Sequence, residues 1–251
     1  MTQHLFILTG ASRGMGLAMA RQLLQPGNSV LCISRSANET LAMQAKQAGA
    51  NLLQWTQDLA LGARTSARLE QWLREQAGSI FTSASLINNA GVIPRIGPLS
   101  EADADDLSNA LRVGLEAPMQ LTSAFLRATQ NWNGLRRVLN ISSGLGRRAM
   151  ASQAGYCAAK AGMDHFTRCL SLEEALKTNG AKVCSLAPGV IDTNMQVQLR
   201  GADSKAFPDQ SSFISLKTSG SLASPDEAAR RVLAVLMRAD FGANPVADVR
   251  D

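Results

Sequence analysis

Three side chains in the middle of the chain have the types and spacing of a proton-transfer device. Tyr156 is the only tyrosine, Lys160 follows it by four residues, and Ser143 precedes both. On a helix, residues four apart lie on one face, one turn apart. A free phenol has a pKa of about 10, and a neighbouring ammonium favours the phenolate and lowers that pKa. With a serine hydroxyl to hold an oxygen atom, the set predicts interconversion of a carbonyl and an alcohol. A buried tyrosine ring beside a solvated lysine is the alternative.

A glycine-rich turn near the start of the chain has the pattern of a phosphate cradle. Residues 5–9 are a short apolar run typical of a buried strand, and Gly10-Ala-Ser-Arg-Gly-Met-Gly16 follows, leading into a stretch with helical spacing. Glycines permit a tight turn and let the backbone approach a pyrophosphate at a helix N-terminus. The order therefore predicts a dinucleotide site, although an ordinary strand-to-helix loop has a similar pattern.

Together with Asn88-Asn-Ala-Gly91, these motifs make the chain resemble the short-chain dehydrogenase/reductase family over nearly its full length. Asp58 and Pro188-Gly-Val-Ile-Asp-Thr193 also match, in the family's order and spacing. The resemblance implies an α/β Rossmann-type fold, a doubly wound parallel sheet in three α/β/α layers. It implies that Ser143, Tyr156 and Lys160 are catalytic. It further implies a cofactor site formed by Gly10, Ser12, Arg13, Gly14, Met15, Gly16, Ser34, Arg35, Asp58, Leu59, Asn89, Ala90, Gly91, Tyr156, Lys160, Pro188, Gly189, Ile191, Thr193 and Met195.

The choice of cofactor follows from the residues after the second predicted strand. Relatives that prefer NAD usually carry an acidic residue where this chain has Ser34. An aspartate would bind a ribose 2′-hydroxyl and repel a 2′-phosphate, whereas Ser34 with Arg35 and Arg13 attracts the phosphate. We therefore expect NADP(H) in preference to NAD(H), unless both arginines only face solvent. The resemblance also implies that Asp58 contacts the adenine amino group.

The elements that must position these residues alternate along the chain. Apolar runs predict strands at 5–9, 29–34, 51–56, 85–88, 137–142 and 182–186, with helical stretches between them. This alternation predicts a parallel sheet with right-handed crossovers and helices on both faces. Residues 188–223, rich in Pro, Gly and Ser, interrupt the rhythm. We expect a substrate loop that acts as a lid, with a variable surface loop as the alternative.

Composition limits the remaining classes of protein. A chain of 251 residues with 45% hydrophobic and 18% charged residues fits one globular domain over 1–251. The net charge is +5, but the basic residues are scattered, which argues against a nucleic-acid partner. No apolar stretch suggests a membrane span, and Met1 leads almost directly into the first strand, so we expect a cytoplasmic protein. The spacing of the cysteines predicts neither disulfides nor a metal site; they are Cys32, Cys157, Cys169 and Cys184.

Gly114 is a departure from the family pattern. The family normally has Asn in a V-N-L motif, where this chain has Val113-Gly-Leu115. That Asn is implicated in a bent helix and in a water-mediated proton relay to the lysine. Glycine tolerates the unusual dihedral angles of a bend, but it cannot supply the side-chain amide. Without that amide the activity could be lowered, and we then expect Gly114→Asn to raise the rate. The alternative is that a main-chain carbonyl already holds the water of the proton relay.

Segments in the last quarter narrow the resemblance to the sepiapterin reductase branch and its bacterial diketone-reducing relatives. They are Asp192-Thr-Asn-Met-Gln196, Leu216-Lys-Thr-Ser-Gly-Ser-Leu222 and Phe241-Gly-Ala-Asn-Pro-Val-Ala-Asp248. In that branch an aspartate near the C-terminus contacts the substrate, and Asp248 has the matching position; a solvated carboxylate is the alternative. Residues 149–155 lack the bulky aromatic side chains that would favour a pterin. Further candidates for substrate contact are Gly144, Leu145 and Met150.

The predicted function is NADPH-dependent reduction of a ketone or α-diketone. Tyr156 would donate the proton, Lys160 would lower its pKa and hold the nicotinamide ribose, and Ser143 would position the carbonyl oxygen. The alternative is an NADP(H)-binding protein with little catalysis, a sensor or assembly partner, as Gly114 allows. The resemblance also implies a homodimer or homotetramer that pairs through helices at 116–129 and 152–177. Small residues would allow close helix approach there, namely Ala117, Ala124, Ala128, Ala158, Ala159 and Ala161.

Overall fold

A parallel sheet forms the central layer of the protein, which a computed structural model describes over residues 3–251. Within that range the sheet has seven strands in the order β3-β2-β1-β4-β5-β6-β7, and every neighbouring pair is parallel. Its inner strands are nearly continuous apolar runs because helices cover both faces. The strands are β1 (Gln3–Thr9), β2 (Asn28–Ser34), β3 (Asn51–Thr56), β4 (Phe81–Asn88), β5 (Leu135–Ile141), β6 (Lys182–Ala187) and β7 (Val246–Asp248).

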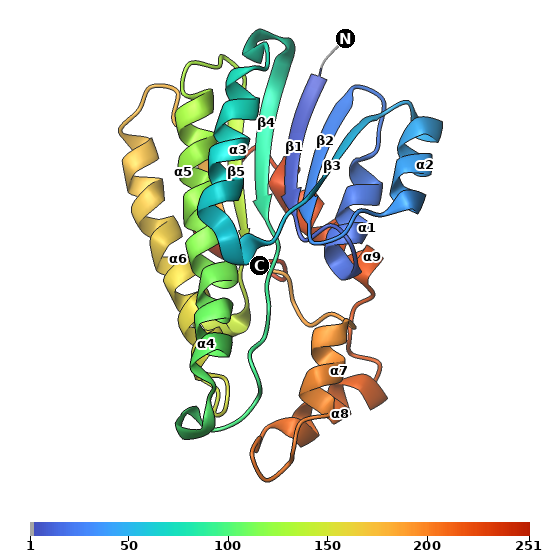
Figure 1. The fold of residues 1–251 in the computed structure, drawn as a ribbon, viewed down its shortest axis with the longest axis vertical. Helices are drawn as coiled ribbons and strands as arrows, with labels where there is room; N and C mark the ends of the chain where they lie inside the picture. Colours follow the sequence, from blue (N-terminus) through green and yellow to red (C-terminus); the bar gives the residue numbers. More distant parts are fainter. Residues whose placement is uncertain (1–2) are drawn as a thin grey trace.

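Helices pack on both faces of this sheet, as Figure 1 shows. One face carries α3 (Gly62–Arg74), α5 (Ala117–Thr129) and α6 (Ala154–Ala175), and α4 (Ala104–Leu111) leads into α5. The other face carries α1 (Gly14–Leu23), α2 (Glu39–Ala48) and α9 (Pro225–Met237). Side chains alternate between the two faces along a strand. Leu5 and Ile7 therefore pack in the core beneath α3, α5 and α6, and Phe6 and Leu8 pack in the core beneath α1, α2 and α9. Short 3₁₀ turns lie at Leu59–Leu61, Gly78–Ile80, Leu99–Glu101 and Gly144–Gly146.

The Rossmann-type α/β fold predicted from the sequence is confirmed, including its six main strands. The seventh strand, β7, was not predicted because three residues give too short a pattern to recognise. It pairs with the edge of β6, with Ser185 opposite Val246 and Ala187 opposite Asp248. This pairing brings the C-terminal segment to the carboxyl edge of the sheet, where ligands bind in open α/β folds.

The helix that contains Gly114 departs from α-helical geometry over one turn. Residues Arg112–Glu116 form a π-helical turn between α4 and α5, and the N–H of Ala117 donates to the carbonyl of Arg112. Gly114 has no positive φ, so the helix departs from α-helical geometry here without a dihedral angle reserved for glycine. The extra residue of the π turn makes the local change instead, and such turns often occur at functional sites.

The segment at 188–223 contains two further helices, α7 (Asn194–Arg200) and α8 (Gln210–Thr218). A parallel bridge between Ile191 and Ala223 joins its two ends. In Figure 1 the helices stand beyond the carboxyl edge of the sheet. They enclose a small core of Leu199, Phe207 and Phe213, against which Ile93, Ile96, Met150 and Met195 pack. Among the helices of residues 3–251, none combines the length and the apolar character needed to cross a membrane.

Candidate active site

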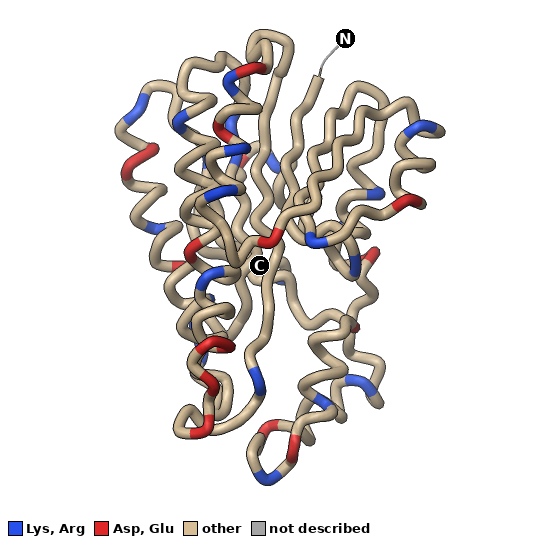
Figure 2. The backbone as a smooth tube through the Cα atoms, viewed as in Figure 1, with Lys and Arg blue, Asp and Glu red and all other residues tan. Residues whose placement is uncertain are grey.

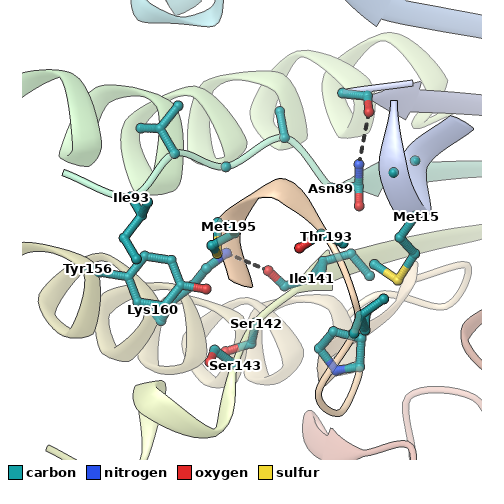
Figure 3. A pocket seen from close by; sticks show the side chains of 18 of the residues that line it. Met15, Asn89, Ile93, Ile141, Ser142, Ser143, Tyr156, Lys160, Thr193 and Met195 are labelled. Carbon is teal, nitrogen blue, oxygen red and sulfur yellow. Dashed lines mark hydrogen bonds between the residues drawn. The ribbon is translucent and has the colours of Figure 1, made fainter. Parts of the chain in front are cut away.

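A cavity of about 840 Å³ opens at the carboxyl edge of the sheet, between the strand ends and the α7–α8 segment. It lies next to β1 and β4, where the strand order reverses, which is the usual ligand crevice of this fold. The walls contain all the cofactor, catalytic and substrate residues predicted from the sequence, with the exception of Asp58. Figure 3 shows Ser143, Tyr156 and Lys160 in this cavity, with Asn89, Thr193 and Met195.

The three predicted catalytic residues come from two neighbouring elements. Ser143 follows β5 and caps the 3₁₀ turn Gly144–Gly146, where its Oγ accepts a hydrogen bond from the N–H of Leu145 at 3.2 Å. Tyr156 and Lys160 lie one turn apart on α6, and both are buried. The Nζ of Lys160 donates to the carbonyl of Ile141 at 2.6 Å, as Figure 3 shows. It lies 5.8 Å from the centre of the Tyr156 ring.

Burial, more than the neighbouring ammonium, sets the proton affinity of Tyr156 in this structure. Burial raises its pKa above the ordinary value, and a hydrogen bond with Ser143 opposes that rise. The Lys160 ammonium is directed to the carbonyl of Ile141, so the expectation that it lowers the pKa of Tyr156 stays a prediction. Burial in turn lowers the pKa of Lys160 to about 8, against the opposing charge of Asp164. The phenol is thus the stable form, which suits a proton donor.

A buried carboxylate lies one turn beyond the lysine on the same helix face. Asp164 is 1% exposed, and its Oδ1 accepts a hydrogen bond from Ser185 Oγ at 2.6 Å. Its other oxygen has no hydrogen-bond partner within residues 3–251. A Cβ on Gly146 would lie 2.7 Å from that oxygen, so the turn after Ser143 packs closely against the carboxylate. Asp164 was not singled out from the sequence, although its spacing of four from Lys160 is a readable signal.

Hydrogen bonds between β1 and β4 hold the glycine-rich turn. Thr9 Oγ1 accepts from the N–H groups of Asn89 and Ala90, each at 2.9 Å, and the Asn89 amide donates to the carbonyl of Thr9. Gly10 has φ +71°, and a Cβ on Gly16 would lie 2.1 Å from the carbonyl oxygen of Gly10. Only glycine therefore fits at both ends of the turn.

The turn and the helix after it fit a phosphate-bearing ligand. Helix α1 starts at the cavity wall with no side-chain cap from the described residues and no acidic residue in its first turn. Its first N–H groups and positive dipole end favour an anion. Arg13 and Arg35 are exposed on the same wall, and neither forms an ion pair within the described part of the chain. The donors present thus match the phosphates of a dinucleotide.

Two predicted cofactor residues have structural partners of their own. The Ser34 hydroxyl accepts a hydrogen bond from the N–H of Ala11 at 2.8 Å, so it holds the glycine-rich turn from the neighbouring strand. Asp58 lies between the wall residues Gln57 and Leu59 but does not itself line the cavity. Its Oδ1 accepts from the N–H of Ala60 at 3.0 Å.

The predicted substrate residues all line the cavity wall. Gly144, Leu145 and Met150 line the wall near the catalytic set. Asp248 also lines it, with both carboxylate oxygens accepting from the Arg250 guanidinium at 2.7 Å and with Arg147 at 3.7 Å. The hydrogen bond from Arg250 lowers the pKa of Asp248 despite its partial burial. The carboxylate is therefore charged and held by arginines.

Several wall residues were not predicted from the sequence. The most informative is Gln153, which is buried and lies three residues before Tyr156, so the spacing could have indicated it. Others lie in loops or in helices α4, α7 and α8, and their positions at the cavity depend on long-range packing. They include Ile93, Asn109, Ser142, Arg148, Asp192, Gln196, Leu199, Phe213 and Arg250.

Fold and cavity together define a nucleotide-binding α/β oxidoreductase, and comparison with known proteins specifies its family. Residues 4–204 match the family described as short chain dehydrogenase. The chain belongs to this family, whose members use a nicotinamide cofactor.

Two characterised relatives and one solved structure show the extent of the similarity. A benzil reductase ((S)-benzoin forming) of Bacillus cereus is 37% identical over 239 residues, covering 94% of each chain. Sepiapterin reductase of Rattus norvegicus is 32% identical over 257 residues, covering 98% of this chain and 95% of the relative. A short-chain dehydrogenase/reductase structure from Burkholderia vietnamiensis is 35% identical, with a TM-score of 0.66 and coverage of 99% and 98%. The predicted branch of the family is confirmed.

Proposed function

We propose that the protein is an NADPH-dependent reductase of a ketone or α-diketone. The observation that carries this proposal is the position of Ser143, Tyr156 and Lys160 in the same cavity as the glycine-rich turn. The similarity to a benzil reductase, whose name specifies reduction to (S)-benzoin, supports an α-diketone as the substrate class.

Each catalytic side chain has a distinct part in the proposed reaction. Ser143, which lines the cavity with Tyr156, positions the carbonyl oxygen of the substrate. Tyr156 carries its proton at neutral pH because burial raises its pKa, and it transfers that proton to the developing alkoxide. Lys160 would hold the nicotinamide ribose, and its positive charge would stabilise the phenolate that remains. The bound cofactor would supply the hydride.

The preference for NADPH follows from charge at the cavity wall. Arg35 and Arg13 are exposed cations beside the end of β2, and no acidic side chain at position 34 opposes a 2′-phosphate. A guanidinium binds phosphate oxygens in a fixed fork, which favours NADPH over NADH. In this proposal the α7–α8 segment closes the cavity over the cofactor and the substrate.

A second candidate is an NADP(H)-binding protein with little catalysis, acting as a sensor or assembly partner. The observation that favours it is Gly114, which lacks the family's side-chain amide. Turnover separates the two candidates, since both bind NADPH but only a reductase oxidises it in the presence of a carbonyl compound.

The test is NADPH oxidation with benzil, 1-phenyl-1,2-propanedione and sepiapterin, for the wild type and for Tyr156→Phe. We expect turnover of a diketone by the wild type and a loss of about 10²–10⁴-fold in the variant, the usual contribution of a general acid. NADPH affinity should stay near the wild-type value, because the ring and its packing remain. A variant within about tenfold of the wild type would contradict the role of Tyr156. Binding without turnover of any carbonyl compound would favour the second candidate.

A further inference from the structure

Gln153 has a buried, unpaired amide at the wall of the cavity. Its side chain belongs to a residue that is 1% exposed and lines the cavity, at the N-cap of α6. Neither Oε1 nor Nε2 has a hydrogen-bond partner among residues 3–251. Only its backbone is engaged, where the carbonyl accepts from the N–H of Cys157 at 2.8 Å. The buried amide therefore has one donor group and one acceptor group without partners, three residues before Tyr156.

An unpaired buried amide is unfavourable for the folded protein. An unsatisfied buried polar group destabilises the folded protein, whereas an apolar side chain of the same size carries no such cost. Gln153 is the residue for which both amide atoms are buried and unpaired among residues 3–251, whereas Asn88 and Gln196 each leave only the oxygen buried without a partner. Gln54 exchanges two hydrogen bonds with the backbone of Asn38, and the Asn89 amide donates to Thr9. The free energy lost at Gln153 is recovered when a ligand supplies the missing partners.

The backbone before Gln153 is held in a conformation that few residues adopt. Ser152 has φ 64°, the only positive φ of a non-glycine residue in the described chain. Its Oγ donates to the carbonyl of Ala206 at 2.5 Å, and its own carbonyl accepts from the N–H of Gly97. A non-glycine residue in the left-handed region is strained and persists only where the surroundings enforce it. The turn fixes Gln153 where the chain enters the catalytic helix.

We propose that Gln153 binds the second oxygen of a 1,2-dicarbonyl substrate. This inference rests on the function proposed above. Tyr156 is a near neighbour of Gln153, because residues three apart lie on the same side of a helix. When Ser143 and Tyr156 hold the reacting carbonyl, the adjacent carbonyl accepts a hydrogen bond from Gln153 Nε2. In the reverse direction the hydroxyl of an α-hydroxyketone can donate to Oε1. The amide thus distinguishes vicinal dioxygenated compounds from simple ketones.

Apolar residues of the cavity wall accommodate the apolar part of such a substrate. Its side chains include Ile93, Leu145, Met150, Leu199 and Phe213. Large apolar surfaces favour aryl or alkyl substituents on the dicarbonyl. The buried amide is neutral, so it recognises an uncharged oxygen, while the exposed Arg148 on the same wall leaves recognition of a carboxylate as an outcome to test.

The test compares two substrates that differ only in the second oxygen, 1-phenyl-1,2-propanedione and propiophenone. In Gln153→Met, which keeps the length of the side chain, we expect the ratio of kcat/KM for the diketone to that for the ketone to fall about 10–100-fold. Met150→Leu is the control, because it alters the wall that both substrates share and should change both values in parallel. Phenylpyruvate is a third substrate, and a loss confined to it would assign Gln153 to carboxylates and overturn the proposal.

A second measurement separates substrate recognition from a structural role. Removing an unpaired buried amide should raise the Tm of the ligand-free Gln153→Met protein, whereas loss of a structural hydrogen bond would lower it. A lower Tm with equal losses on both substrates would overturn the proposal. The proposal would also be overturned if the ratio of kcat/KM for the diketone to that for the ketone fell in Gln196→Met but not in Gln153→Met. Gln196 is the other buried glutamine of the wall.

Failure of the proposed function gives a different result. A wild type that reduces neither compound would contradict the reductase assignment. In that case the role of Gln153 is tested by the rise in Tm that each compound causes in the presence of NADPH, which requires no turnover. The diketone should stabilise the wild type more than propiophenone does, and this difference should vanish in Gln153→Met. Equal stabilisation of the wild type by both compounds would overturn the inference.

Discussion

At the scale of single residues, Lys160 connects the electrostatics of the cavity to a measurable pH dependence. It is 4% exposed, and burial lowers its pKa to about 8 while Asp164 opposes the shift. Below that pH the side chain is an ammonium, and above it the charge that stabilises the Tyr156 phenolate is lost. We expect kcat/KM for carbonyl reduction to fall as the pH rises through about 8. Activity that is constant up to pH of about 10 would contradict this role.

The charge of Asp164 provides a variant with a defined direction. In Asp164→Asn the amide oxygen can still accept from Ser185, so the hydrogen bond at 2.6 Å need not be lost. Without the negative charge, the pKa of Lys160 should fall further, and the midpoint of the activity profile should move to lower pH. Glu39→Gln is the matched control, because that exposed carboxylate at the start of α2 lies away from the cavity.

Arg35 gives a second prediction at this scale, on cofactor choice. Arg35→Gln should weaken NADPH binding about 10–150-fold, because a hydrogen bond to a charged group contributes about 1.5–3 kcal/mol. NADH lacks the 2′-phosphate and should lose little. Titration of both cofactors checks this result, with Arg64→Gln as an exposed control on α3 outside the cavity wall. Equal losses for both cofactors would show that Arg35 does not contact the phosphate.

At the scale of elements, local sequence patterns predicted the strands and motifs, but they did not predict features that depend on packing between distant segments. Six strands were readable because each is an apolar run bounded by turn residues, whereas β7 has three residues that become a strand only by pairing with β6. The glycine-rich turn and the Tyr156–Lys160 spacing are local, so the site was readable too. The orientation of Lys160 to Ile141 was not, because it depends on contact between α6 and β5.

The π-helical turn around Gly114 changes the expectation for Gly114→Asn. A Cβ at this position would lie 3.2 Å from the Cβ of Ala159, next to Lys160 on α6. Ala159 must move by a few tenths of an ångström to admit this Cβ, and that shift would reach Lys160, the next residue on α6. The structure therefore favours crowding over the rate gain expected from the sequence, so we expect Gly114→Asn to be slower than the wild type.

Gly114→Ala separates the two effects, since it adds the Cβ without the amide. Both variants should reduce a diketone more slowly than the wild type in single-turnover measurements of hydride transfer. If the amide assists the proton relay, Gly114→Asn should be about 3–10-fold faster than Gly114→Ala. This gain is smaller than the usual contribution of a general acid or base, because the amide only orients the water. Equal rates would show that the missing amide is not limiting. An Asn variant faster than the wild type would contradict the crowding argument.

At the scale of the whole molecule, charge does not define a partner surface. Figure 2 shows Lys and Arg spread over the chain and interleaved with Asp and Glu, consistent with a net charge of only +5. The surfaces of α5 and α6 are more informative. Ala158 and Ala161 are exposed, as are Met119 and, at 72%, Leu172. Ala117, Ala124 and Ala159 are buried within the subunit, so they allow close packing inside it and cannot contact a second copy.

These exposed residues lead to the prediction that the protein is a homodimer or homotetramer. Large apolar side chains on neighbouring helices are better covered by a symmetric partner than left in water. Light scattering at micromolar concentration should give about two or four times the chain mass of 26.6 kDa. Leu172→Arg should shift the assembly toward smaller species. Met43→Arg, at an equally conspicuous apolar residue that is 61% exposed on α2, should leave it unchanged, because α2 lies on the other side of the sheet. A wild type of monomeric mass would contradict the prediction, and an effect of Met43→Arg alone would place the contact on α2.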